Sequence, residues 1–122
     1  MSFPDKLTLS PIKNISGTVD LPGSKSLSNR ILLLSMLAEG HTEIHNLLDS
    51  DDTRRMVEAL KKLGVEVLED RNQNRISVYG TSGTIPVTEA TLMLGNAGTV
   101  IRPLTAALTI GKGRFVLDGL QR

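Results

Sequence analysis

Residues 21–30 read Leu-Pro-Gly-Ser-Lys-Ser-Leu-Ser-Asn-Arg, and the rest of the chain can be read outward from this stretch. The Pro-Gly pair interrupts the structure that precedes it. Ser24 is a favourable N-cap, because its side-chain oxygen can accept from a free N–H of a first helical turn. The residues that follow predict a helix over about 24–39, closed by Gly40. Its expected apolar stripe consists of Leu27, Ile31, Leu34 and Ala38, with Leu33 and Leu37 beside it.

The start of this helix has the chemistry of an anion-binding site. Unpaired N–H groups and a partial positive charge at a helix N-terminus favour phosphates and carboxylates. Lys25 and Arg30 add full positive charges, and Ser26 shares a helix face with Arg30 because the two are four residues apart. The same residues are equally typical of a solvated helix start. The spacing matches neither a Walker A loop nor a GxGxxG motif, so it does not name a ligand.

The composition restricts the class of protein. The chain has 122 residues, 39% of them apolar, which suits one modest domain. No apolar run is long enough for a membrane helix or a secretory signal, so we expect a cytoplasmic location. The net charge is +1 and aromatic residues are scarce, which favours a small anionic ligand over a nucleic acid. There is no cysteine, and we expect no metal site at His41 and His45, which fall in a strand, or at the aspartates of 49–52, which suit helix capping.

Expected strands and helices alternate along the chain. In order they are short strands at 7–9 and 17–21, the helix at 24–39, a strand at 42–47, a helix from Asp49 or Ser50 to Gly64, a β-hairpin of 65–68 and 75–79, a loop at 80–88, a helix ending at Gly111, and a strand at 114–118. Gly23, Arg30 and Leu32 recur as Gly95, Arg102 and Leu104, each 72 positions later. This alternation and repeat predict an α/β fold of duplicated βαβαββ units, of which the chain holds about one and a half.

The second informative stretch is residues 94–104, Leu-Gly-Asn-Ala-Gly-Thr-Val-Ile-Arg-Pro-Leu. Asn96, Gly98 and Thr99 form a loop that a ligand could approach closely, because Gly98 has no Cβ. Pro103 lacks an N–H, so the regular helix should begin only a few residues before it.

Three blocks of the sequence together resemble one family. Residues 21–30, the Asn-Leu-Leu-Asp-Ser-Asp-Asp block at 46–52 and residues 94–104 resemble the 5-enolpyruvylshikimate-3-phosphate (EPSP) synthases, in the family's order and spacing. The resemblance covers the whole chain but only the first quarter to third of a family member. It implies the inside-out α/β barrel fold of enolpyruvyl transferases, with two domains of three βαβαββ units each. Residues 1–20 would be crossover strands that join the other domain, and residues 21–122 would be part of the amino-terminal, substrate-binding domain.

The resemblance also implies a reaction, that of a carboxyvinyl (enolpyruvyl) transferase of the shikimate pathway in aromatic amino-acid biosynthesis. The 5-hydroxyl of shikimate 3-phosphate attacks C2 of phosphoenolpyruvate, and the adduct loses phosphate. No cofactor or metal is implied. The partners would be the two substrates and the missing carboxy-terminal domain, in a monomeric enzyme that contacts neither nucleic acid nor membrane. Other acid–base residues belong to the missing part, so we expect the 122-residue chain alone to be inactive. A standalone phosphate-binding or interaction module and one half of a split synthase are the alternatives.

The family's residues for shikimate 3-phosphate carry over onto the first helix. Lys25 would touch both substrates and is the expected catalytic residue. Ser26 and Arg30 would bind shikimate 3-phosphate. Asp52 would lie near the site, and Arg102 would support the second loop rather than contact a substrate.

The family's residues for phosphoenolpyruvate carry over onto the second loop. Asn96, Gly98 and Thr99 would line this pocket. Arg122 would grip phosphoenolpyruvate, although the residues just before it depart from the family pattern. The inhibitor glyphosate would occupy the same pocket, and the unchanged Gly98 and Pro103 predict a glyphosate-sensitive form.

Overall fold

Within residues 4–120, the part of the chain that the structure describes, a computed structural model shows helices and strands in alternation. The elements are α1 (Lys25–Leu37), β1 (His41–His45), α2 (Asp51–Lys62), β2 (Val67–Asp70), β3 (Arg75–Tyr79), β4 (Glu89–Met93), α3 (Gly98–Leu108) and β5 (Arg114–Asp118). This mixture confirms the predicted α/β class. Over the same residues, none of the helices has the length and apolar character needed to cross a membrane.

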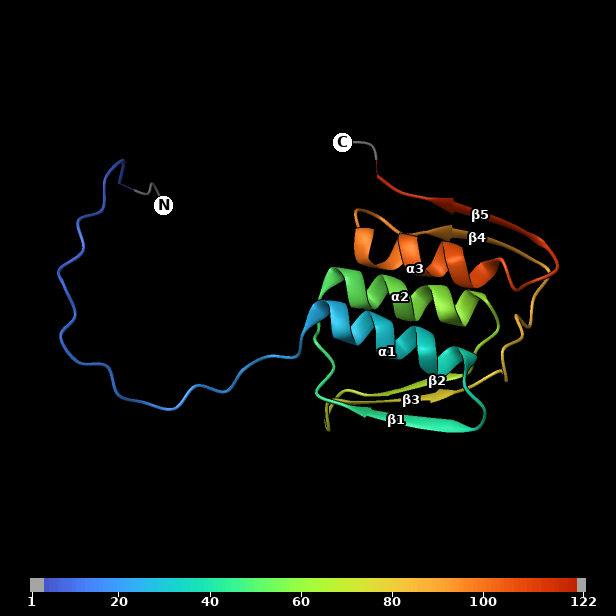
Figure 1. The fold of residues 1–122 in the computed structure, drawn as a ribbon, viewed down its shortest axis with the longest axis horizontal. Coiled ribbons are helices and arrows are strands. Elements are labelled where there is room, and N and C mark those ends of the chain that lie inside the picture. The colour runs from blue at the N-terminus through green and yellow to red at the C-terminus, as the bar shows by residue number, and fades with distance from the viewer. Residues whose placement is uncertain (1–3, 121–122) are drawn as a thin grey trace.

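The strands form two small sheets (Figure 1). In the first, β1 and β2 both pair antiparallel with the central strand β3, so that Ile44 lies beside Ile76 and Val67 beside Val78. The β2–β3 pair confirms the predicted hairpin. In the second sheet β4 and β5 are parallel and are connected through α3. A parallel pair needs such a crossover connection, because a tight turn can join only antiparallel strands.

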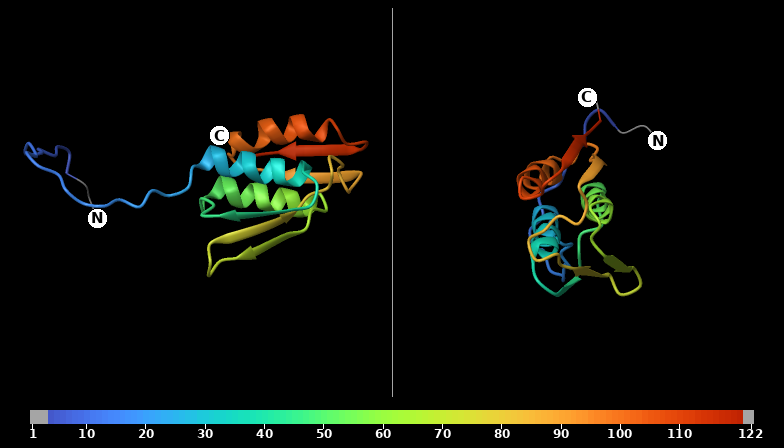
Figure 2. Two further views of the ribbon diagram at one scale, coloured as in Figure 1. Left: turned by 60° about the horizontal axis from the view of Figure 1, so that its bottom comes forward. Right: turned by 90° about the vertical axis from the view of Figure 1, so that its right-hand side faces the viewer.

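The three helices pack against one another between the two sheets (Figure 1). They run in the same direction in both the first view and the tilted view (Figure 2, left), so all three N-termini lie at the same end of the helical layer. Each helix N-terminus carries about half a positive charge on its free N–H groups. The fold therefore brings three partial positive charges to one end of the molecule.

Helix α2 supplies the centre of the core. Its apolar residues recur at helical spacing, and Met56, Leu60 and the flanking Leu63 are fully buried. Burial of an apolar side chain of this size is worth about 1.5–3 kcal/mol. Val78 of β3 and Leu92 of β4 belong to the same apolar cluster, so one core joins the helices to both sheets.

The face that α1 buries differs from the prediction. Leu27 and Leu34 of the expected stripe are 55% and 64% exposed. The buried face instead carries Leu32 and Met36 together with the polar Asn29. The apolar residues of α1 are spread over several sides of the helix, so their spacing alone does not show which face turns inward.

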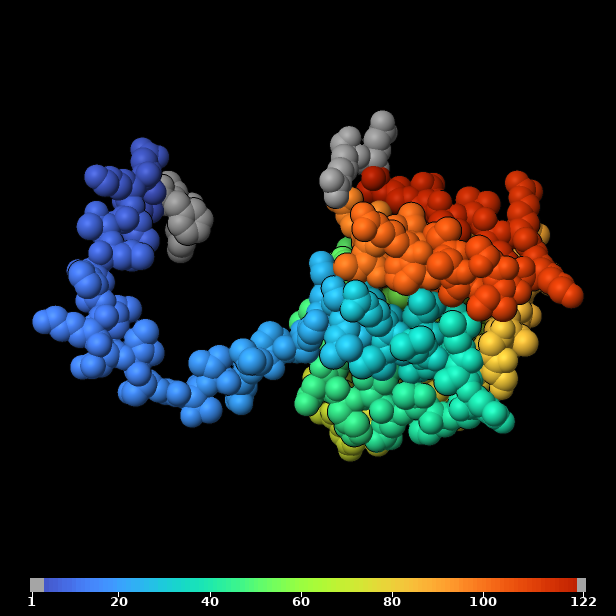
Figure 3. Space-filling view, viewed as in Figure 1, coloured from blue at the N-terminus to red at the C-terminus, as the bar shows by residue number. Residues whose placement is uncertain are grey.

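Residues 4–24 contain neither helix nor strand, so the strands predicted at 7–9 and 17–21 do not form. The segment extends away from the folded body (Figures 1 and 3). A strand needs a neighbour to satisfy its backbone N–H and C=O groups, and no described strand pairs with this segment.

The strand β4 is missing from the prediction. Glu89 and Ala90 are poor strand formers, and the pattern carries no clear alternation. The strand forms because β5 pairs with it and because Leu92 is buried in the core. The predicted repeat is otherwise confirmed in outline, since α3 is followed by β5 as α1 is followed by β1.

Candidate anion-binding site at three helix starts

The start of α1 forms as predicted. Ser24 is the N-cap, with an extended backbone, and its side-chain oxygen accepts from Leu27 N–H at 3.4 Å. Gly23 allows the chain to pass close to the Asn46 carbonyl as it enters the helix, because an added Cβ would lie 2.5 Å from that oxygen. The first turn carries no acidic residue. Lys25 is therefore placed on a helix end that favours anions.

The start of α2 is held by a capping box. Ser50 Oγ accepts from Thr53 N–H at 3.3 Å, and Thr53 Oγ1 accepts from Ser50 N–H at 3.0 Å. Thr53 Oγ1 also donates to the Leu48 carbonyl at 2.6 Å. These reciprocal bonds satisfy the donors that a helix start leaves free. The prediction that Asp49 or Ser50 caps this helix is confirmed for Ser50.

The aspartates around this start lie at helix-terminal positions. Asp49 accepts from Arg54 Nε at 2.7 Å, and this hydrogen bond lowers the pKa of the Asp49 carboxyl and raises that of the Arg54 guanidinium. Asp51 and Asp52 lie in the first turn, where carboxylates complement the helix dipole. Residues 4–120 contain no cluster of three or more His, Cys, Asp or Glu that could hold a metal ion.

The start of α3 differs from the other two because its N-cap residue, Ala97, has no side-chain oxygen to offer. The helix begins at Gly98, five residues before Pro103, in agreement with the prediction. A Cβ added to Gly98 would meet no atom within 4 Å. The Gly98 N–H donates to the Asn96 carbonyl at 3.0 Å, and the Val100 and Ile101 N–H groups donate to the Ala97 carbonyl, so what the α3 start offers is mainly open space beside Gly98 and the positive end of the helix.

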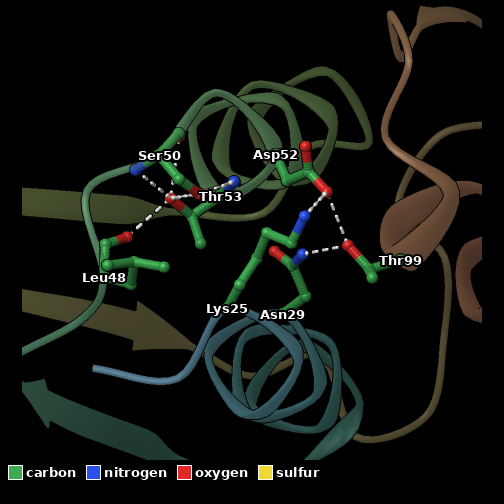
Figure 4. A network of polar contacts seen from close by, with 7 residues as sticks. All are labelled: Lys25, Asn29, Leu48, Ser50, Asp52, Thr53 and Thr99. Carbon is green, nitrogen blue, oxygen red and sulfur yellow. Dashed lines mark hydrogen bonds and ion pairs between the residues drawn. The ribbon is translucent and has the colours of Figure 1, made fainter. Parts of the chain in front are cut away.

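Four side chains join the three helix starts (Figure 4). Lys25 Nζ of α1 lies 3.3 Å from Asp52 Oδ2 of α2, and Thr99 Oγ1 of α3 donates to the same oxygen at 2.8 Å. Asn29 Nδ2 of α1 donates to Thr99 Oγ1 at 2.9 Å. We call Lys25, Asn29, Asp52 and Thr99 the three-helix cluster.

The cluster holds Lys25 where a ligand can still reach it. The Lys25 side chain is 47% exposed, whereas that of Asp52 is only 19% exposed. A half-exposed ion pair of this kind contributes no more than about 1 kcal/mol to stability. Its consequence is therefore mainly geometric, because the Asp52 carboxylate, anchored by Thr99, keeps the ammonium of Lys25 close to the α2 and α3 starts.

Four of the remaining predicted site residues lie on α1 or at the start of α3. Ser26 and Arg30 are exposed on α1, and Asn96 and Gly98 are exposed on the α3 loop. Arg122 lies outside the described residues. Sequence reasoning missed Asn29, which lies four residues after Lys25 and so shares its helix face. No sequence signal identifies it, because the apolar spacing along α1 does not show which face turns inward.

A cavity on the described surface lies away from this cluster. It has a volume of about 320 Å³ and lies between α2 and the β2–β3 hairpin, with Lys61, Glu69, Asp70 and Arg75 among its lining residues. Its charged groups are already paired, Lys61 with Glu69 at 2.6 Å and Arg75 with Asp70 at 3.4 Å. Cavity size therefore does not identify the site here, and the convergence of helix starts is the stronger indicator of anion binding.

Comparisons with known proteins agree on one family. The sequence model described as EPSP synthase (3-phosphoshikimate 1-carboxyvinyltransferase) matches residues 9–122. The 3-phosphoshikimate 1-carboxyvinyltransferase of Ralstonia pickettii is 54% identical over 97% of this chain and 27% of its own length. The chloroplastic 3-phosphoshikimate 1-carboxyvinyltransferase of Petunia hybrida is 56% identical over 98% of this chain and 24% of its own length.

A solved structure supports the same relationship. EPSP synthase from Acinetobacter baumannii superposes with a TM-score of 0.77 and 28% sequence identity, over 85% of this chain and 23% of that one. The chain thus spans about a quarter of the length of the curated relatives it matches.

Proposed function

Because the chain belongs to the EPSP synthase (3-phosphoshikimate 1-carboxyvinyltransferase) family, we propose that it forms part of the substrate site of such an enzyme. The reaction joins the enolpyruvyl group of phosphoenolpyruvate to the 5-hydroxyl of shikimate 3-phosphate and releases phosphate. Two phosphates and two carboxylates must share one site. The observation that carries the proposal is the convergence of three helix starts around Lys25, since preorganised donors of this kind stabilise crowded anionic charge.

In this proposal α1 binds shikimate 3-phosphate. Ser26 and Arg30 are exposed on the first turns of the helix and can donate to phosphate or hydroxyl groups. Lys25 is the first residue of α1, with its ammonium 3.3 Å from Asp52 of α2, and it is the residue that we assign to contact both substrates. Its ammonium would neutralise charge on phosphoenolpyruvate as the carbon–oxygen bond forms at C2 and phosphate departs.

The α3 start would bind phosphoenolpyruvate. Gly98 leaves open space, and the backbone there approaches the ligand without a Cβ in the way. The hydroxyl of Thr99 is already engaged by Asp52 and Asn29, so Thr99 would contact the ligand through its backbone N–H. Asn96 and Arg122 complete this half of the proposed site.

The extended segment before α1 has a different assignment. We assign residues 1–20 to the crossover strands that join the other domain of the enzyme and residues 21–122 to the partial amino-terminal domain. The absence of sheet partners for the described residues 4–20 supports this assignment. The cytoplasmic location and the monomeric state of the complete enzyme stay predictions.

Phosphate release from the two substrates tests the function. The 122-residue chain alone should release no phosphate above background, and mixing it with the complementary three quarters of a family enzyme should restore turnover. Lys25→Ala in the mixture should abolish that turnover. Turnover by the chain alone would refute the assignment to a partial domain, and a mixture that is active with Lys25→Ala would refute the role of Lys25.

A further inference from the structure

Asn29 is a buried member of the three-helix cluster, and none of the proposed substrate contacts involves it. Its side chain is 0% exposed on the inward face of α1. Nδ2 donates to Thr99 Oγ1 at 2.9 Å, while Oδ1 is buried without a hydrogen-bond partner among the described residues. A buried acceptor without a partner costs about 1–3 kcal/mol, so its presence in a native core calls for an explanation.

The hydrogen-bond inventory fixes the direction of every bond in the cluster. The Asp52 carboxylate can only accept, so the single proton of the Thr99 hydroxyl must point to Asp52 Oδ2. Thr99 Oγ1 can then only accept from its other neighbour. The amide of Asn29 must therefore present its NH₂ group, because a rotated amide would oppose two acceptors.

We propose that Asn29 is a positioning residue for the substrate site. By donating to Thr99, it commits the Thr99 proton to Asp52, and Asp52 is thereby held in the orientation that keeps the Lys25 ammonium beside the α2 and α3 starts. The chain of contacts begins and ends on α1, passes through α3 and α2, and so fixes the three helix starts relative to one another (Figure 4). Asn29 acts only through these neighbours, since it is fully buried. This inference rests on the proposed function.

A double-mutant cycle tests the proposal. Asn29→Leu removes the donor while keeping the branched shape at Cγ, and Thr99→Val removes the hydroxyl with little change in volume. Affinity for shikimate 3-phosphate should fall about 10-fold in each single variant, and the double variant should lose about 10-fold rather than 100-fold because the two residues act as one unit. Ser35→Ala is the matched control. Ser35 is buried on the same helix but donates only to the Ile31 carbonyl at 2.8 Å, so Ser35→Ala should leave the affinity for shikimate 3-phosphate unchanged.

Two further readouts separate positioning from stability and from failure of the proposed function. Urea unfolding is measured for all variants. The proposal would be overturned if the two substitutions were coupled in the free energy of unfolding but had no effect on affinity for shikimate 3-phosphate. Amide hydrogen exchange is measured without ligand at Val100 and Ile101, whose N–H groups bond to the Ala97 carbonyl. Asn29→Leu should accelerate exchange there about 10-fold, and Ser35→Ala should not.

If the unmodified chain alone binds no shikimate 3-phosphate, affinity is measured in the mixture with the complementary part of a family enzyme; absence of binding and turnover there refutes the proposed function, and the exchange result alone then decides the role of Asn29. Unchanged exchange at the α3 start in Asn29→Leu would overturn that role. Faster exchange confined to the α3 start would support it.

Discussion

At the scale of single residues, the site depends on how one carboxylate is shared. Asp52 Oδ2 accepts a hydrogen bond from the Thr99 hydroxyl and also forms an ion pair with the partly exposed Lys25. Neither Ser26 nor Arg30 is buried, and both stay accessible on α1. Affinity for an anion should therefore depend much more on Lys25 than on surface cations far from the helix starts.

A charge-matched pair of variants tests this dependence. Lys25→Ala and Arg71→Ala each remove one positive charge, but Arg71 is 89% exposed beside the hairpin turn. We expect Lys25→Ala to lower affinity for shikimate 3-phosphate at least 30-fold and Arg71→Ala to lower it less than 2-fold, as measured by calorimetric titration. Equal losses would indicate that only net charge matters, contrary to the site assignment.

The Asp49–Arg54 pair gives a prediction of pH dependence. The hydrogen bond from Arg54 is the main cause of the lowered pKa of Asp49. A lowered pKa in the folded state means a stabilising contribution that is present above the ordinary Asp pKa of about 3.9 and is lost as pH falls through the folded value. Both side chains are solvent-exposed, so salt should weaken this contribution.

Carboxyl carbon NMR titration measures this effect directly. Arg54→Gln should raise the pKa of Asp49 toward its ordinary value. Arg71→Gln should raise it less, since Arg71 acts only through longer-range Coulomb attraction. Equal responses to the two substitutions would contradict the hydrogen bond as the main cause.

At the scale of secondary-structure elements, features that depend on neighbouring residues were predicted from the sequence, whereas features that depend on distant contacts were not. The caps Ser24 and Ser50 and the β2–β3 hairpin depend on residues close in sequence, and all were predicted. The strand β4 depends on pairing with β5, and the inward face of α1 depends on partners such as Thr99 on another helix.

The candidate site shows the same division. Lys25 and Asp52 could be proposed from motifs, because each lies in the first turn of a helix that the sequence predicts. The hydrogen bonds that connect α1 and α2 to α3 are between residues 47 and 70 positions apart, from Thr99 to Asp52 and from Asn29 to Thr99. Periodicity and capping rules carry no information about contacts at such separations, so Asn29 could not be placed without the fold.

Two glycines with opposite surroundings give a prediction at this scale. A Cβ on Gly80 would overlap the Ala38 carbonyl and lie 2.8 Å from the Ser35 carbonyl, whereas one on Gly98 would meet nothing within 4 Å. Gly80→Ala should therefore destabilise the chain by about 2 kcal/mol or more in urea unfolding, because backbone atoms must move. Gly98→Ala should be neutral or stabilising by up to about 1 kcal/mol, because alanine favours the helix.

The ligand readout should show the reverse order. In a complete family enzyme that carries these residues, Gly98→Ala should raise the KM for phosphoenolpyruvate and weaken inhibition by glyphosate, since the new methyl group enters the proposed pocket. Gly80→Ala should leave both unchanged at temperatures where the enzyme is folded. A Gly98→Ala enzyme with unaltered KM and inhibition would remove Gly98 from the proposed site.

At the scale of the whole molecule, the stability of the folded body should depend little on the extended segment before α1. One apolar cluster connects the helices to both sheets, but the described residues before α1, 4–24, contribute no buried residue to it. Stability should therefore come almost entirely from the residues after Gly23. In the proposed assignment, this segment would pair with another part of the enzyme.

Deletion of residues 1–20 tests this separation. The thermal midpoint of the shortened chain should lie within about 2 °C of that of the full chain, because the described residues 4–20 are all exposed and belong to no part of the core. Joined to the rest of a family enzyme, the same deletion should reduce activity, because the crossover strands would be absent. A fall of 10 °C or more in the isolated chain would show that the segment belongs to this body.

Amide NMR during titration of shikimate 3-phosphate into the chain is the most direct test of the anion-binding site at the three helix starts. We predict chemical-shift changes concentrated at residues 24–30, 51–53 and 96–99, with little change in the cavity between α2 and the β2–β3 hairpin. A well-dispersed spectrum without changes at these helix starts, or with changes confined to that cavity, would contradict the central claim.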